Sequence, residues 1–118
     1  TQSTAKEIAL YAPTRPVAAT LMTEVMAVAQ SVGVDLGSGP VKTVAEAGDR
    51  VSILSSTLQD VRAGRPLEID AIVYAVLEVA RLNGVATPTL DVIAACAGLL
   101  NEHIVTEKVA IGPRRLEA

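Results

Sequence analysis

Aromatic residues, cysteine and histidine are almost absent from this sequence. Its 118 residues include two tyrosines, no phenylalanine and no tryptophan, which argues against surfaces that stack nucleic-acid bases or sugar rings. The single histidine, His103, excludes a metal site built from several histidines, and we expect no metal site. His103 follows an Asn-Glu pair near the end of a predicted helix, which favours a surface or capping role over a catalytic one.

The one cysteine, Cys96, lies inside the apolar run VIAACAGLL (92–100). It cannot form an internal disulfide, and we expect a small buried side chain in a protein of the reducing cytoplasm. The run is far shorter than the roughly 20 residues that span a bilayer, and the polar N-terminus has no secretory leader. We therefore predict no membrane partner. The first residue is Thr1 rather than Met, so we expect that residues upstream have been removed.

Charge is low and scattered. The net charge is −3 at pH 7, and Lys and Arg form no cluster beyond the pair Arg114 and Arg115, so a nucleic-acid partner is not predicted. Half of the residues are apolar, which suffices for a core. The length fits one domain, residues 1–118.

Apolar residues repeat at helical spacing, and no stretch alternates as a strand would. Pro and Gly mark the helix ends. Gly33 and Gly84 are each followed by valine, a pattern typical of a left-handed glycine that stops a helix. The sequence predicts an all-α domain of about five helices, at 16–33, 41–54, 56–64, 66–84 and 87–105, with 106–118 as a loop or tail.

Glu68 stands out in the helix predicted at 66–84. On a helical wheel it shares a face with Ile72, Ala75 and Val79, whereas the other charged residues of this helix lie on the opposite side. Two interpretations fit. The carboxylate lines a pocket and accepts hydrogen bonds from a ligand, or it is a first-turn glutamate that the helix dipole stabilises in water.

A polar run, Ser55 to Gln59, precedes Glu68. Ser56 and Gln59 have the spacing of a capping box, and the alternative is that a serine hydroxyl serves a polar ligand. No histidine is close in sequence, so a nucleophilic serine is not supported. The charged residues around the following turn are expected to form surface ion pairs: Asp60, Arg62, Arg65 and Asp70.

The stretch SSTLQDVRAGRPLEIDAI (55–72) strongly resembles the C-terminal domain of the ketopantoate reductases, or 2-dehydropantoate 2-reductases. That family's segment reads like S-S-M-L-Q-D-x-x-x-G-R-x-T-E-I-D-x-I-N-G. GVATPTLD (84–91) is similar to the family's turn before its last helix, and RPVAATLMTEVMAVAQSVGV (15–34) to an earlier helix. The likeness covers about residues 5 to 105.

The resemblance implies an all-helical domain, as in 6-phosphogluconate dehydrogenase-like proteins, that pairs with an N-terminal Rossmann domain. In the family, NADPH reduces ketopantoate to pantoate, a precursor of pantothenate and coenzyme A, and a lysine is the general acid. By resemblance, Ser56 binds substrate and Glu68 faces the cofactor and substrate, because both line the cleft between domains.

Three features depart from the family pattern. No G-x-G-x-x-G occurs, so the Rossmann half lies outside this chain. The catalytic lysine would precede Thr1, and Lys6, followed by Glu7 and Ile8, does not fit it, so no catalytic residue is assigned here. Val73 and Tyr74 replace the family's Asn-Gly, which indicates a different 2-keto acid as a possible substrate.

Two functions follow. The first is the substrate-binding and dimerisation half of an NADP-dependent reductase, inactive alone, with the missing Rossmann domain and a second copy as partners. The second is a free-standing helical dimerisation or interaction module that kept the fold without the chemistry.

Overall fold

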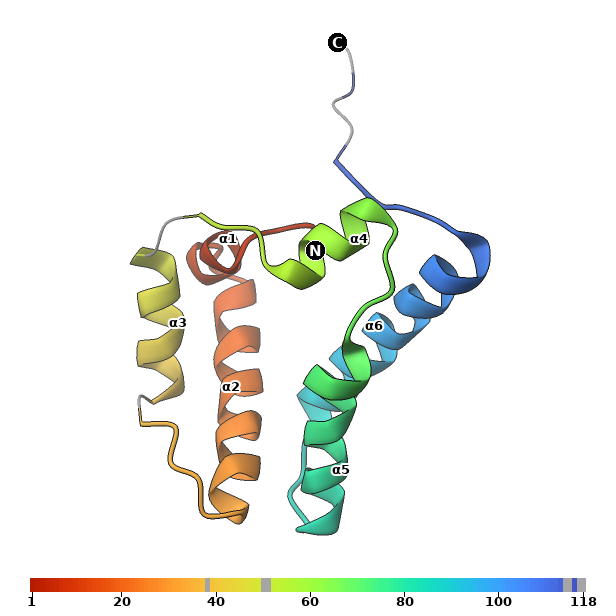
Figure 1. Cartoon of the computed structure of the whole chain (residues 1–118). Helices are drawn as coiled ribbons and strands as arrows, with labels where there is room; N and C mark the ends of the chain where they lie inside the picture. Colours follow the sequence, from red (N-terminus) through yellow and green to blue (C-terminus); the bar gives the residue numbers. More distant parts are fainter. Residues whose placement is uncertain (38, 50–51, 114–115, 117–118) are drawn as a thin grey trace.

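The computed structural model describes residues 1–37, 39–49, 52–113 and 116. Every regular element in these ranges is helical (Figure 1), which confirms the all-α prediction. The elements are α1 (Ala5–Leu10), α2 (Thr14–Ser31), α3 (Pro40–Asp49), α4 (Ser56–Ala63), the π-helical segment η1 (Asp70–Tyr74), α5 (Ala75–Leu82) and α6 (Pro88–Glu107).

Each of the five predicted helices has a counterpart, but several boundaries were wrong. The helix predicted at 41–54 ends at Asp49, so Leu54 lies outside it, and Val51 falls outside the described residues. The helix predicted to open at Pro66 begins three to four residues later, at Ile69 and Asp70. The last helix, α6, continues to Glu107, two residues into the segment predicted as a loop or tail.

A short helix, α1, was not predicted. It begins with a capping box: the Glu7 amide donates to the Thr4 hydroxyl (3.2 Å), and the Thr4 amide donates to the Glu7 carboxylate (2.6 Å). The Thr4 amide most of all, and then the Thr4 hydroxyl, which donates to the same carboxylate oxygen (2.9 Å), hold the pKa of Glu7 below its usual value. Ser52 donates to the same Thr4 hydroxyl (3.0 Å), so the start of α1 is tied to the segment before α4.

α2 is the central helix. It contacts α1 and α3 on one side and α5 and α6 on the other, as Figure 1 shows. The core between α2, α5 and α6 contains Leu77, Leu90 and Ala94, and the partly buried residues packed against it include Leu21 and Val25. These two lie in the middle of α2, whereas Val17 near its start and Val32 just after its end are exposed.

Three helices end in the same way, at a glycine with positive φ: Gly33, Gly64 and Gly84. After α2 the Val34 amide donates to the Ala29 carbonyl, and after α5 the Val85 amide donates to the Ala80 carbonyl, both at 2.9 Å. These are the six-to-one hydrogen bonds of the Schellman motif. The left-handed stop predicted at Gly33 and Gly84 is therefore confirmed.

The start of α6 is capped by a side chain from another helix. Glu24 of α2 is only 8% exposed, and its two carboxylate oxygens accept hydrogen bonds from the amides of Thr89 (2.9 Å) and Leu90 (2.8 Å). Burial is the largest single influence on the pKa of Glu24 and opposes ionisation, but the hydrogen bonds from the Leu90 amide and from the amide and side chain of Thr89 together outweigh it and lower the pKa. No pattern in the sequence predicted this role.

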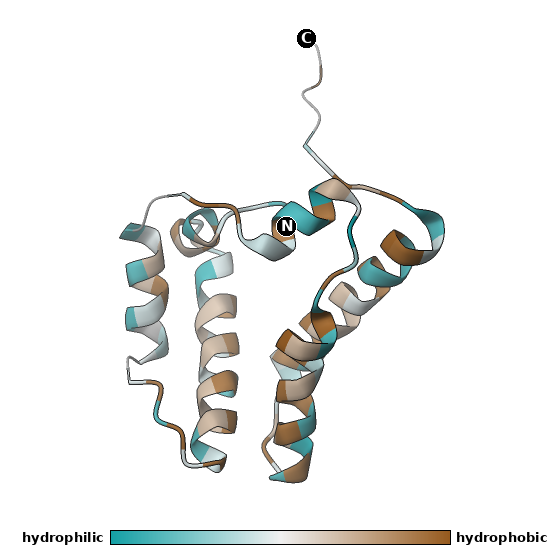
Figure 2. Cartoon of the chain, in the orientation of Figure 1, coloured by the Kyte–Doolittle hydropathy of each residue, from teal (hydrophilic) through white to brown (hydrophobic). Residues whose placement is uncertain are grey.

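The molecule is open for its size. Its radius of gyration is 15.4 Å, whereas a compact chain of this length has about 13.5 Å. Its accessible surface is 8004 Å² for a mass of 12.2 kDa, whereas a compact monomer of that mass has about 6,000 Å². Figure 2 shows apolar residues recurring along α2, α5 and α6, and many large apolar side chains are exposed.

Cys96 belongs to this exposed surface, so the prediction that it is buried was wrong. The buried side of α6 contains Leu90, Ala94 and Ile104. Cys96 lies on the opposite side of the helix, together with Val92 and Leu99, because residues three and four apart share a face. Val92 is 62% exposed and Leu99 is 60% exposed. We call Val92, Cys96 and Leu99 the outer stripe of α6.

Candidate functional site

Glu68 is placed by the non-helical segment between α4 and η1 rather than by a helix face. Its carbonyl accepts the first hydrogen bond of the next helical turn, from the Ile72 amide (3.1 Å), and its side chain is exposed. The interpretation that Glu68 lies on the apolar face of a helix starting at Pro66 was therefore wrong. The residue nevertheless lines a cavity of about 50 Å³, whose other walls are mainly apolar: Thr57, Leu67, Ile69, Ile72, Val73 and Ala97.

Ser56 is the first residue of α4, and Ser55 is the capping residue. The Ser55 hydroxyl accepts a hydrogen bond from the Leu58 amide (3.2 Å). Gln59 donates to the Leu54 carbonyl (3.0 Å). The capping box predicted for Ser56 and Gln59 was therefore wrong by one residue. Because the Ser55 hydroxyl accepts the capping hydrogen bond, the exposed Ser56 hydroxyl is not used as the helix cap and remains available to a ligand.

The start of α4, next to Ser56, and Glu68 lie close together in the structure. Thr57, the neighbour of Ser56, and Glu68 line the same small cavity, although eleven positions separate them in the chain. Ser56 itself does not line that cavity. The start of α4 and the residue before η1 thus form adjacent parts of one surface, and an exposed carboxylate and an exposed hydroxyl flank it.

A hydrogen bond to α6 fixes the segment that carries Glu68. The Leu67 amide donates to the Asn101 side-chain oxygen at 2.8 Å. Before it, Arg65 forms the predicted surface ion pair with Asp60 (2.7 Å), while Arg62 instead donates to the Gln2 carbonyl (3.2 Å). Nothing local in the sequence indicated the role of Asn101.

η1 follows Glu68 directly and is wound as a π helix, in which the Ala75 amide donates to the Asp70 carbonyl. Single π turns inside helices are frequent at functional sites. Tyr74, which stands where the family has glycine, ends this turn and packs on Gly98 of α6: a methyl group built on Gly98 would collide with the Tyr74 hydroxyl. Both line a cavity of about 340 Å³ that also includes Ile69 and Asn101.

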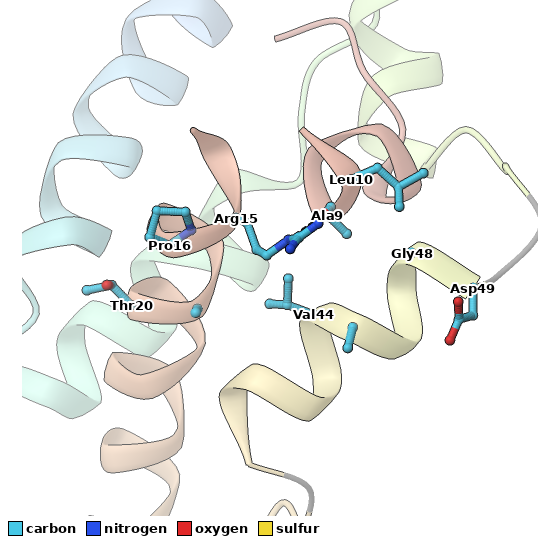
Figure 3. A pocket seen from close by; sticks show the side chains of 10 residues that line it. Ala9, Leu10, Arg15, Pro16, Thr20, Val44, Gly48 and Asp49 are labelled. Carbon is cyan, nitrogen blue, oxygen red and sulfur yellow. Dashed lines mark hydrogen bonds between the residues drawn. The ribbon is translucent and has the colours of Figure 1, made fainter. Parts of the chain in front are cut away.

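The remaining candidate residues lie elsewhere. His103 is exposed on α6, 4.0 Å from Glu107, which confirms a surface position. Among the described residues, no group of three metal-ligating side chains comes together, and no described helix is long and apolar enough to cross a membrane. A cavity of about 680 Å³ lies between α1, α2 and α3 (Figure 3). Neither Ser56 nor Glu68 lines it.

The sequence matches the family model for the ketopantoate reductase PanE/ApbA C terminal over residues 1–101. This chain belongs to that family. The chain is 42% identical over 95 residues to a 2-dehydropantoate 2-reductase of Mesorhizobium japonicum, an alignment that covers 80% of this chain and 29% of the relative.

The fold is also similar to a crystal structure of 2-dehydropantoate 2-reductase from Methylococcus capsulatus. The TM-score is 0.70 with 30% sequence identity, and the match covers 75% of this chain and 31% of that one. The chain thus spans less than a third of each of these relatives, and it corresponds to their C-terminal helical part.

Proposed function

We propose that residues 1–118 form one helical domain of an NADPH-dependent 2-dehydropantoate 2-reductase and supply one wall of its active site. The observation that carries the proposal is the surface where the start of α4 meets Glu68, since it brings together the two elements that resemble the family's site. Such a parent enzyme would act in the cytoplasm, would bind NADPH mainly through a separate Rossmann domain, and would take its general-acid lysine from outside this chain.

Each site residue has a role that suits its chemistry. NADPH supplies the hydride when it is bound. The Glu68 carboxylate only accepts hydrogen bonds, so it suits a hydroxyl or an amide N–H of cofactor or substrate and does not suit a phosphate. The Ser56 hydroxyl donates to an oxygen of the 2-keto acid. Both groups are exposed and sit on short, hydrogen-bonded segments, which favours binding and orientation rather than proton transfer.

A chimaera tests this proposal. The C-terminal part of the Mesorhizobium japonicum reductase would be replaced by this chain, and NADPH oxidation would be followed with ketopantoate and with other 2-keto acids. We expect the chimaera to turn over at least one of them and the isolated chain to turn over none. A folded chimaera that reduces no 2-keto acid would contradict the proposal.

Variants of that chimaera test the residues. Glu68→Ala should lower kcat/KM by about tenfold or more, the loss typical of a hydrogen bond to a charged group, and Ser56→Ala should raise KM for the keto acid. Glu78→Ala, an exposed carboxylate on α5, is the matched control and should change neither. Unchanged kinetics in Glu68→Ala would remove Glu68 from the site.

The outer stripe of α6 favours the second candidate, a dimerisation or interaction module. A soluble monomer rarely leaves a contiguous stripe of large apolar side chains in water, and a helix that is apolar on opposite sides is usually covered on both. Homodimerisation through this stripe is compatible with the reductase as well. The two candidates are separated by the chimaera, because a module without chemistry would dimerise and still give no turnover.

A further inference from the structure

The cavity between α1, α2 and α3 has the volume and the lining of a ligand site. Its volume of about 680 Å³ lies within the range of roughly 300 to 1,000 Å³ that is usual for small-molecule pockets. The walls are mostly small or apolar: Ala9, Leu10, Pro16, Ala19, Val44, Ala45 and Gly48. Leu10 is 56% exposed, so a large apolar side chain borders the open cavity without being covered.

Arg15 is the one cationic side chain among the described residues that line the cavity, and a hydrogen bond fixes its position. Its Nε donates to the Ala9 carbonyl at the end of α1, at 2.9 Å, and Figure 3 shows the side chain extending toward Ala9 across the cavity. The neighbouring Thr14 hydroxyl donates to the Ile8 carbonyl (2.6 Å). Two residues at the start of α2 therefore cap the end of α1, and the position of the guanidinium follows from that cap.

The two terminal nitrogens of Arg15 still have hydrogen-bonding capacity. Among the described residues, no carboxylate lies within ion-pair distance of Arg15. A planar guanidinium with two free N–H groups on one edge matches the two oxygens of a carboxylate. Asp49, the one anionic residue in the described lining, belongs to the end of α3 and lies apart from Arg15 in Figure 3. Its charge disfavours a second carboxylate on the ligand.

We propose that this cavity binds an aliphatic monocarboxylate, with the carboxylate on Arg15 and the apolar body against Ala19, Val44 and Ala45. The charge of Arg15 and the apolar walls together define the ligand class, because a bare apolar groove would not distinguish an acid from an alcohol or an amine. The site is separate from Ser56 and Glu68, and it does not depend on the proposed reductase activity.

Three probes of one shape test the proposal on the 118-residue chain: adamantane-1-carboxylate, 1-adamantanemethanol and 1-adamantanamine. Binding would be followed through the amide signals of Thr20, Ala45 and Gly48 in two-dimensional NMR. We expect the carboxylate to bind about tenfold more tightly than the alcohol, and the amine to bind most weakly, because only the carboxylate gains charge-assisted hydrogen bonds.

Variants locate the site. Arg15→Met keeps the aliphatic stem, and it should abolish the preference for the carboxylate while leaving binding of the alcohol unchanged. Ala45→Leu fills the cavity and should weaken all three probes. Arg81→Met, which removes an exposed arginine of α5, is the control and should change nothing. Because Arg15→Met also removes the bond to Ala9, Arg15→Lys, which retains the charge, provides a second test and should keep part of the preference.

Each result of these binding measurements either supports or contradicts the proposed carboxylate site. Equal binding of the acid and the alcohol, or a preference that survives in Arg15→Met, would overturn the assignment of Arg15. Binding that is unaffected by Ala45→Leu would place the ligand elsewhere, and no binding of any probe would show that the cavity is not a ligand site. The proposal would be established by a carboxylate preference that disappears in Arg15→Met, by weaker binding of all three probes in Ala45→Leu, and by unchanged binding in Arg81→Met, whatever the chimaera does.

Discussion

Ser55 and Ser56 are adjacent residues, but only Ser55 contributes to the fold through a hydrogen bond to the backbone of α4. Ser55→Ala should lower the free energy of unfolding by about 1 kcal/mol, since it removes an N-cap. Ser56→Ala should leave stability within about 0.5 kcal/mol, as an exposed substitution normally does. Urea denaturation of the two variants measures the difference. Equal losses would mean that Ser56 shares the capping role and is not reserved for a ligand.

Tyr74 and Gly98 are matched in size. Gly98→Ala should destabilise the domain by about 1 to 3 kcal/mol, the usual cost of overpacking, because the new methyl group meets the Tyr74 hydroxyl. In the double variant Gly98→Ala with Tyr74→Phe most of this loss should disappear, since the next atom of the ring lies 3.6 Å from the methyl position.

A double-mutant cycle by chemical denaturation checks this coupling. Additive effects of the two substitutions would mean that the tyrosine moves aside at no cost. A coupled pair would show that Tyr74 is held where it narrows the cavity beside Ile69 and Asn101.

At the scale of the element, the start of α6 depends on a charge supplied by α2. The ionised Glu24 carboxylate stabilises the fold because its pKa is lowered there. This contribution is fully present above the pKa of the unfolded chain, near the ordinary value of 4.5, and it is lost as the pH falls through the lower folded value.

Glu24→Gln should therefore be less stable than the natural protein at pH 7, and the difference should shrink as the pH falls below about 4.5. Thermal or urea unfolding between pH 7 and pH 3 measures the difference. Glu7→Gln is a matched control. Its loss of stability relative to the natural protein should also shrink as the pH falls, because the pKa of Glu7 is lowered too. In the double variant Glu7→Gln with Glu24→Gln, the loss caused by Glu24→Gln should be unchanged. A gap that stays constant with pH would mean that the charge of Glu24 is not what stabilises the cap.

The elements themselves could be predicted where the signal is local. All five expected helices are present, and the glycines at 33 and 84 end theirs as predicted, because backbone conformation at a helix end is decided within a few residues. α1 was missed because six residues are too few for a periodic pattern. The helix start predicted at Pro66 was wrong because the next residue, Leu67, lies in a non-helical segment. Its amide donates a hydrogen bond to the Asn101 side chain.

The candidate site could be predicted only in part for the same reason. Ser56 and Glu68 came from the resemblance of residues 55–72, which is a local signal. The pairings that complete the surroundings are Leu67 with Asn101 and Tyr74 with Gly98, and each joins positions more than twenty residues apart. No local pattern in the sequence predicts such pairs, and the same is true of Glu24 with Leu90.

At the scale of the molecule, the exposed apolar surface predicts association. If the outer stripe of α6 covers a second copy, Leu99→Lys should shift the chain from dimer to monomer, because a buried lysine at such a contact is strongly unfavourable. Sedimentation equilibrium measures the change. Ile53→Lys is the control, since Ile53 is exposed in the segment before α4 and its replacement should leave the mass unchanged. A natural chain that is monomeric at high concentration would contradict this interface.

The bond from Glu24 to the start of α6 also has a consequence for how the chain folds. It joins residues separated by 65 and 66 positions, so it can form only after the intervening helices have closed a long loop. Interactions of such range are usually incomplete in the folding transition state and act mainly on the rate of unfolding. This one carboxylate would then lengthen the lifetime of the native state without setting how fast that state is reached.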